Sequence, residues 1–253
     1  EGRQLLDNGC SAVMNGQRDE AFATFEGLGG IPYKKEDYWY LNLLPLYGKD
    51  YQIPLKYIHQ DVDMNEAFRC TVTDLVTNPV LTVNGWWFEG NAQPEVPDEV
   101  VICSLREASI KYPDLFHKHY NKYAKAADKD GLVALNTAFA QDGVFVYVPD
   151  GVILEKPIQI INLLRAKADL MGYQRNLIVV GKHAHVTLLV CDHALSENYF
   201  LMNNATEVYM AENAYVDYYQ VQNQHLGASQ INSLFVSQQK HSGFTTHIIS
   251  LYV

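Results

Sequence analysis

The second half of the chain consists of short apolar strands separated by a turn that recurs at a nearly constant interval. The turn places a small residue directly before a strand, at positions 151, 184, 214 and 243, which lie 33, 30 and 29 residues apart. A near-constant period with strands in every repeat is typical of coils stacked along an axis, each burying its inward side chains against its neighbours. We therefore predict a solenoid, and a β-sandwich with evenly spaced hairpins is the alternative.

The strands predicted for this half follow one another without a credible helix beyond Ala138. Most are β-branched or aromatic runs bounded by turn residues, which is the usual pattern of buried strands. The predicted strands cover residues 144–148, 152–154, 158–163, 177–180, 185–191, 198–202, 207–210, 215–222, 233–237 and 244–252.

The first half has a mixed pattern. An interrupted apolar stripe predicts a helix within the first thirty residues, and a second helix is predicted over residues 113–127. Strands are predicted within residues 68–88, with Asn84-Gly85 as a hairpin turn, and at residues 100–104. The fold class that we predict is mainly β. A helical or mixed α+β N-terminal domain (residues 1–130) precedes a right-handed parallel β-helix core (residues 131–253).

Composition narrows the classes of function. The net charge is −10 and the 19 Lys and Arg residues are scattered, so the basic face that a nucleic-acid binder needs is missing. The sequence has no run of eighteen apolar residues, and we expect no membrane association. The four cysteines include no Cys-x-x-Cys pair, which favours neither a disulfide framework nor a zinc ribbon and indicates a reducing, cytoplasmic location.

The two ends of the sequence suggest a fragment. The chain begins at Glu1 without a Met and without a visible secretion leader, and it stops within the apolar segment 247–253. An apolar strand at a terminus leaves a sheet edge that can associate. We therefore expect further residues after Val253 in the natural protein, and a possible homodimer when the chain is studied in isolation.

The candidate metal ligands are four residues close together in the sequence. His183 and His185 lie two apart, so they would share one face of a strand, and Cys191 and His193 follow. Imidazole and thiolate suit zinc, iron or copper, and a metal-binding cupin-like barrel is one alternative function. However, no Glu follows the pair at close range and His183 falls at a turn. We favour surface histidines and predict no metal ligand and no bound cofactor for this chain alone.

Other catalytic motifs are missing. The sequence contains neither a Gly-x-Ser-x-Gly elbow nor a phosphate-binding Gly-rich loop ending in Gly-Lys. A carbohydrate-active β-helix enzyme is a second alternative, but such enzymes use clustered charged residues, whereas the later coils here carry Asn, Gln, Ser and Tyr, as in residues 220–224. We predict no catalytic residue and no enzymatic activity.

Three segments resemble a known family. Residues 135–149, which read LNTAFAQDGVFVYVP, closely resemble the entry to the β-helix in the SufB/SufD family of iron–sulfur cluster assembly proteins, and Gly151, Val152 and residues 156–158 continue the match. Residues 31–39 are similar to the N-terminal motif of the SufD branch, with Tyr33 and Asp37 in place of its Thr and Glu. Residues 200–224 also resemble the central coils of the family.

The resemblance implies a function that the residues alone do not. It implies a non-catalytic scaffold subunit of the SUF assembly complex, which pairs with a SufB-type scaffold and docks a SufC-type ATPase, while the cluster is assembled on the wider complex. The family's ATPase-docking helices and cluster-site residues lie in a C-terminal helical region. On this resemblance they would follow Val253, so no site residue is carried over to this chain.

Overall fold

The computed structural model describes residues 9–33, 36–68, 75–125 and 130–251. Lys34, Lys35 and Cys70 lie outside the described residues, as do parts of the segments that we predicted at both ends of the chain and at residues 68–88 and 113–127.

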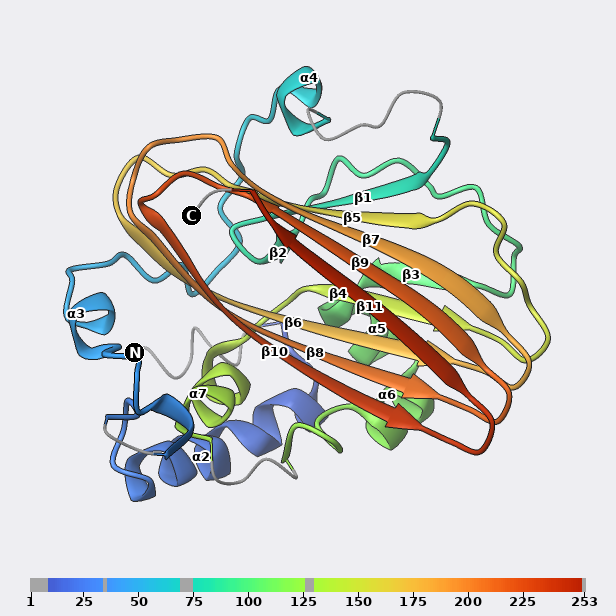
Figure 1. Ribbon diagram of the computed structural model, residues 1–253, viewed down its shortest axis with the longest axis horizontal. Helices are drawn as coiled ribbons and strands as arrows, with labels where there is room; N and C mark the ends of the chain where they lie inside the picture. The colour runs from blue at the N-terminus through green and yellow to red at the C-terminus, as the bar shows by residue number, and fades with distance from the viewer. Residues whose placement is uncertain (1–8, 34–35, 69–74, 126–129, 252–253) are drawn as a thin grey trace.

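Eight strands wind into four coils. Each coil has two strands, one in each of two sheets (Figure 1). Neighbouring strands of successive coils are parallel in both sheets. The predicted parallel β-solenoid is therefore confirmed, and the sandwich alternative is wrong. The strands are β4 (Val144–Val148), β5 (Ile158–Leu164), β6 (Leu170–Val180), β7 (His185–Ala194), β8 (Phe200–Met210), β9 (Tyr215–Asn223), β10 (Ala228–Gln238) and β11 (Gly243–Ser250).

The coils stack with a short and slowly decreasing repeat. In one sheet, Phe145 pairs with Leu177, whereas Leu170 pairs with Phe200 and Phe200 with Ala228. These offsets of 32, 30 and 28 residues are close to the interval read from the turns. The regular register stacks corresponding side chains of successive coils.

The first coil is covered by strands from the first half of the chain. β1 (Asn78–Val83) pairs in parallel with β5, while β2 (Trp86–Trp87) and β3 (Val101–Ser104) pair antiparallel with β1 and β4. The turn between β1 and β2 has positive φ at both Asn84 (53°) and Gly85 (85°), as the predicted hairpin turn requires. These strands belong to the same two sheets as the coils. The domain boundary at residues 130 and 131 stays a prediction.

Several of the predicted strand segments differ in the structure. Residues 152–154 form only an isolated bridge, because this segment makes just two backbone hydrogen bonds to His185. The segments predicted at 198–202 and 207–210 are one continuous strand, β8. Its polar middle interrupts the apolar pattern, but Asn203 and Asn204 form hydrogen bonds within the fold and therefore remain compatible with a buried strand.

The tight turns of the solenoid have a common backbone conformation. Gly151, His183, Asn213 and His241 have φ angles of 76°, 56°, 58° and 59° and lie in the turns before β5, β7, β9 and β11, which belong to one sheet. This left-handed region is reached most easily by Gly and Asn. The turn that recurs in the sequence therefore reflects the need for a residue with positive φ. His183 and His241 adopt this conformation although they are neither Gly nor Asn.

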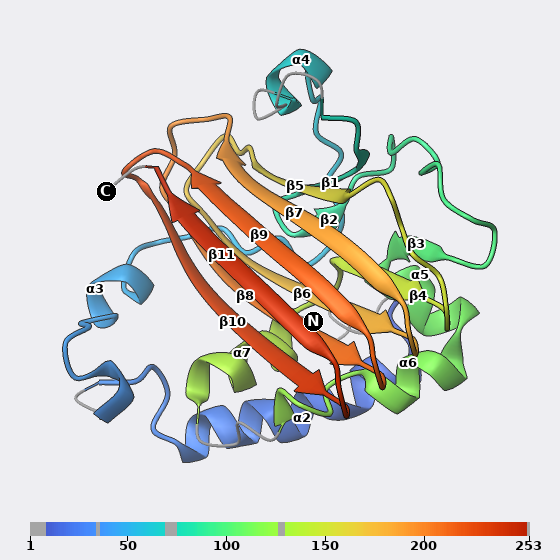
Figure 2. The ribbon, with the colours of Figure 1, turned by 45° about the vertical axis from the view of Figure 1, so that its right-hand side comes forward.

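A layer of helices covers the outer face of the sheet that contains β4, β6, β8 and β10 (Figure 2). Met14, Leu105 and Phe116 pack there against Leu177 and Val179. The helices of this layer are α2 (Ala12–Gly27), α5 (Leu105–Lys111), α6 (Pro113–His119) and α7 (Gly131–Phe139). In the part of the chain that the structure describes, three short helices lie elsewhere: η1 (Glu36–Tyr38), α3 (Leu44–Tyr47) and α4 (Met64–Ala67).

The helix boundaries correct our predictions. The helix predicted over residues 113–127 ends at His119, because Tyr120 has an extended backbone and Asn121 then adopts a φ of 54°. Helix α7 was not predicted, although Asp130 accepts a capping hydrogen bond from the N–H of Leu132 (2.8 Å) and marks its start. Among the described residues, no helix has the length and apolar character needed to cross a bilayer.

Candidate functional site: a buried polar junction and the solenoid interior

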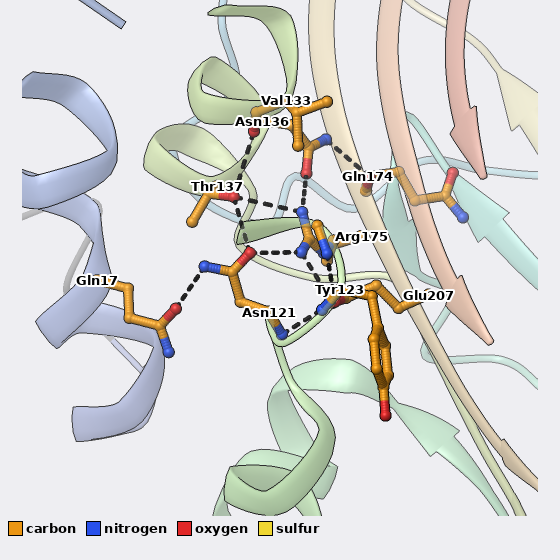
Figure 3. A network of polar contacts seen from close by, with 10 residues as sticks. Gln17, Asn121, Tyr123, Val133, Asn136, Thr137, Gln174, Arg175 and Glu207 are labelled. Atoms are coloured by element: carbon orange, nitrogen blue, oxygen red, sulfur yellow. Dashed lines mark hydrogen bonds and ion pairs between the residues drawn. The ribbon is translucent and has the colours of Figure 1, made fainter. Parts of the chain in front are cut away.

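A pair of opposite charges is completely buried between the solenoid and the helices. Arg175 projects from β6 and Glu207 from β8 toward the helical layer, as Figure 3 shows. Arg175 Nη2 lies 2.8 Å from Glu207 Oε2, and both side chains are 0% exposed. Because removing a charge from water costs several kcal/mol, such a pair is tolerated only when hydrogen bonds satisfy its remaining atoms.

Glu207 receives these hydrogen bonds from the backbone that follows α6. Its carboxylate accepts from the N–H groups of Asn121 (2.8 Å), Tyr123 (3.0 Å) and Ala124 (3.0 Å). Three amide donors and one guanidinium therefore converge on one carboxylate. This convergence fixes the loop after α6 to the third coil of the solenoid.

Arg175 makes the matching contacts to α7. Its guanidinium donates to Asn136 Oδ1 (3.1 Å), Thr137 Oγ1 (3.3 Å) and Asn121 Oδ1 (2.9 Å). Asn136 in turn donates through Nδ2 to the carbonyl oxygens of Gln174 (3.0 Å) and Asn203 (2.8 Å). One helix side chain thus joins two successive coils, β6 and β8.

The pair Asp142-Gly143 connects the same junction to the first coil. Asp142 accepts hydrogen bonds from the backbone N–H groups of Trp87 (3.1 Å) and Arg106 (3.2 Å), while burial raises the pKa of its carboxyl group. Gly143 has a φ of 153°, and a Cβ at this position would come within 2.0 Å of the Arg175 carbonyl oxygen. Only glycine fits there. The motif residues of segment 135–149 therefore assemble the junction.

A column of polar side chains also runs through the interior of the solenoid. Thr82 Oγ1 donates to Asn162 Oδ1 (2.8 Å), Asn162 Nδ2 donates to Asp192 Oδ1 (2.8 Å), and Gln220 Nε2 donates to Asp192 Oδ2 (2.7 Å). Asp192 is 0% exposed, and burial raises the pKa of its carboxyl group. Polar groups of the facing sheet, including Asn204, line a cavity of about 60 Å³ beside this column.

The four candidate metal ligands do not converge. His183 is exposed at its turn, and His185 Nε2 lies 2.9 Å from Asp217 Oδ2 on the neighbouring strand. Cys191 and His193 are buried toward the other end of β7, and the eight residue steps from His185 to His193 span roughly 26 Å of extended chain. No group of three or more His, Cys, Asp or Glu side chains with metal-site geometry occurs in the part of the chain that the structure describes. The solenoid also overturns the barrel that a cupin would require.

Sequence reasoning did not single out Arg175 or Glu207. The available signal was their separation of 32 residues, which is one period of the solenoid and places opposite charges on adjacent coils. The N-terminal motif does reach the same layer, since Tyr38 Oη donates to Asp130 Oδ2 (2.8 Å) at the start of α7.

The fold and the junction define a class of protein: a parallel β-solenoid that is joined through buried polar contacts to a helical flank. Comparison with known families gives two consecutive matches, "SufBD protein N-terminal region" over residues 1–160 and "SUF system FeS cluster assembly, SufBD core domain" over residues 163–252. The chain belongs to the SufBD family of iron–sulfur cluster assembly proteins.

Similar curated proteins come from both branches of this family. The chain is 32% identical over 132 residues to an iron–sulfur cluster assembly SufBD family protein of Synechocystis, covering 51% of this chain and 27% of the relative. It is 30% identical over 132 residues to SufD of Bacillus subtilis (49% and 28%) and 31% identical over 136 residues to SufB of that organism (53% and 29%). The aligned part therefore spans little more than a quarter of these relatives.

Proposed function

We propose that the protein is a SufD-type, non-catalytic scaffold subunit of a cytoplasmic SUF complex. In this proposal it pairs with a SufB-type scaffold and docks a SufC-type ATPase, while the iron–sulfur cluster is assembled on the wider complex and not on this chain alone. The observation that carries the proposal is the family match across both the N-terminal region and the core domain.

The chemistry of the junction supports a structural role for its charged residues. Glu207 accepts hydrogen bonds from Arg175 and from the loop after α6, and both terminal nitrogens of the Arg175 guanidinium donate to buried partners that include Glu207 and α7. A carboxylate that acts as a base needs access to a substrate proton, and Glu207 is wholly enclosed. The SufD branch is supported by the resemblance of residues 31–39 to the SufD motif, whereas identity to SufB and SufD relatives is similar.

Co-purification tests the proposal. The protein in its natural full length would be co-expressed with the SufB-type and SufC-type proteins of its own organism and captured by a tag on the ATPase. We expect all three chains to elute together in a fixed ratio. Elution of a SufB–SufC complex that excludes this protein would contradict the scaffold role, and the SufB–SufC pair expressed alone is the control.

Two further measurements address the alternatives. Stoichiometric iron or zinc in the purified chain, lost when His183 and His185 are both changed to Ala, would favour a metal protein over the proposed scaffold. Cleavage of a polysaccharide panel by the same preparation would favour a carbohydrate-active enzyme. We expect neither result.

A further inference from the structure

A cavity of about 320 Å³ lies in the helical layer, between α2, α7 and the loop after α6. Its volume is at the lower end of the range for small-molecule sites, about 300 to 1,000 Å³. The residues that give it chemical character are Glu20, Ala21, Asn121, Lys125, Val133 and Thr137.

The inner end of this cavity is polar and rigidly held. Asn121 and Thr137 are buried, and both accept hydrogen bonds from the Arg175 guanidinium. Asn121 also donates through its amide nitrogen to Gln17 Oε1 (2.5 Å), a residue of α2 that lines the cavity. Thr137 Oγ1 already donates to Val133 O (3.2 Å) and to Asn121 Oδ1 (3.4 Å). A hydroxyl or amide oxygen entering the cavity would therefore meet the second N–H of the Asn121 amide, while Ala21 and Val133 provide apolar walls.

The outer end of the cavity carries one charge of each sign. Lys125 Nζ lies 2.8 Å and 2.9 Å from the two carboxylate oxygens of Glu20. The two side chains are 49% and 63% exposed, so they lie on the solvent side of the cavity. An exposed pair of this kind contributes at most about 1 kcal/mol, and a ligand could separate it at little cost.

We infer that this cavity binds a free α-amino acid with a short polar side chain. The α-carboxylate replaces Glu20 as the partner of Lys125, and the α-ammonium group binds the Glu20 carboxylate. The side chain points inward, where its methylene contacts Ala21 and Val133 and its polar end reaches Asn121 or Thr137. Each charge and each surface of the cavity then has a matching part of the ligand. This inference does not depend on the proposed assembly role.

Titration with L-serine and L-asparagine tests the inference, with binding followed by calorimetry and by the melting temperature. We expect a saturable rise in melting temperature with both amino acids. Ethanolamine is L-serine without the carboxylate and 3-hydroxypropanoate is L-serine without the ammonium group, so each should bind at least tenfold more weakly. The inference is wrong if L-serine or L-asparagine fails to bind at up to about 100-fold molar excess over millimolar protein. It is also wrong if the two control compounds bind as tightly as the amino acids.

Variants locate the site. Glu20→Gln and Lys125→Met should each weaken L-serine binding at least tenfold, with circular dichroism confirming that the fold is unchanged. Glu107→Gln and Lys111→Met alter a matched exposed ion pair on α5, and they should leave binding unaltered. If all four variants bind L-serine with the parent affinity, the ligand binds elsewhere and the assignment of this cavity is wrong.

Discussion

At the scale of single residues, Arg175 and Glu207 form an ion pair in which both side chains are fully buried. Replacing one partner leaves the other as an unpaired charge, and this typically costs about 3 to 5 kcal/mol. We expect Glu207→Gln to lower the free energy of unfolding by about this amount, because the amide leaves the enclosed guanidinium of Arg175 without its counter-charge. Urea unfolding followed by circular dichroism measures the change.

A matched substitution separates this effect from a general loss of charge. Glu107→Gln removes the carboxylate of an exposed pair on α5, where the expected loss is below about 1 kcal/mol. Similar urea-unfolding midpoints for Glu207→Gln and Glu107→Gln would show that the buried Arg175–Glu207 pair contributes no more to stability than the exposed pair.

His119 makes stability depend on pH. Its ring is buried at the end of α6, 4.4 Å from the ring of Tyr209, and burial lowers its pKa from 6.5 to about 4. Below pH 6.5 the unfolded chain binds a proton that the folded chain does not, so stability falls as the pH drops from 6.5 toward 4. The loss attributable to this residue is at most about 3 kcal/mol.

The comparison of two unfolding series tests this assignment. His119→Phe removes the titrating group but keeps an aromatic ring beside Tyr209. We expect its unfolding free energy to decline less steeply between pH 6.5 and pH 4 than that of the parent. Parallel pH profiles would assign the dependence to other groups.

At the scale of elements, the polar column inside the solenoid sets the register of the strands. Gln220→Ala removes a donor to the enclosed carboxylate of Asp192. Leaving a buried acceptor without its partner costs about 1 to 3 kcal/mol, so thermal unfolding should shift to a lower temperature. Asn223→Ala changes an exposed amide at the end of the same strand and should be neutral. A neutral Gln220→Ala would show that the Gln220–Asp192 bond adds little to stability.

The same column shows which features of the fold the sequence could predict. β4 was predicted to the residue, since Val144–Val148 is an uninterrupted apolar run between turn residues. The interior polar residues could not be recognised in this way. Asn162 and Asp192 are polar residues of the kind usually found on a solvent-facing surface, so the sequence does not indicate that they are buried. Their hydrogen bond forms only because successive coils stack on one another.

The candidate site was less predictable than the fold. His183 and His185 attracted attention because they lie two residues apart in the sequence, yet the turn conformation at His183 and the contact between His185 and Asp217 account for their positions. The junction around Arg175 joins residues that are far apart in the chain. Its geometry emerges only when the helical layer is placed on the sheet.

At the scale of the whole molecule, the last coil exposes apolar side chains. Ile248, Ile249 and Leu251 are 58%, 50% and 58% exposed, and each of β10 and β11 is paired on one side only among the described residues. Open apolar edges favour association. We expect the 253-residue chain to form dimers or larger species as its concentration rises, as measured by multi-angle light scattering.

Substitutions on two surfaces test this expectation. Ile249→Lys places a charge on the open coil and should shift the equilibrium toward the monomer. Ile110→Lys changes another exposed isoleucine, on α5, and should have no effect. A strictly monomeric parent at high concentration would contradict the prediction.

The bonds from Asn136 to the carbonyl oxygens of Gln174 and Asn203 have a consequence for how the protein opens. Stacked repeats ordinarily fray one at a time from an end. Because the Asn136 side chain binds to both β6 and β8, the second and third coils cannot separate independently. We expect the amide hydrogens of these two coils to exchange as a single unit, while those of the fourth coil exchange sooner. Asn136→Ala would uncouple them, turning one cooperative opening into two.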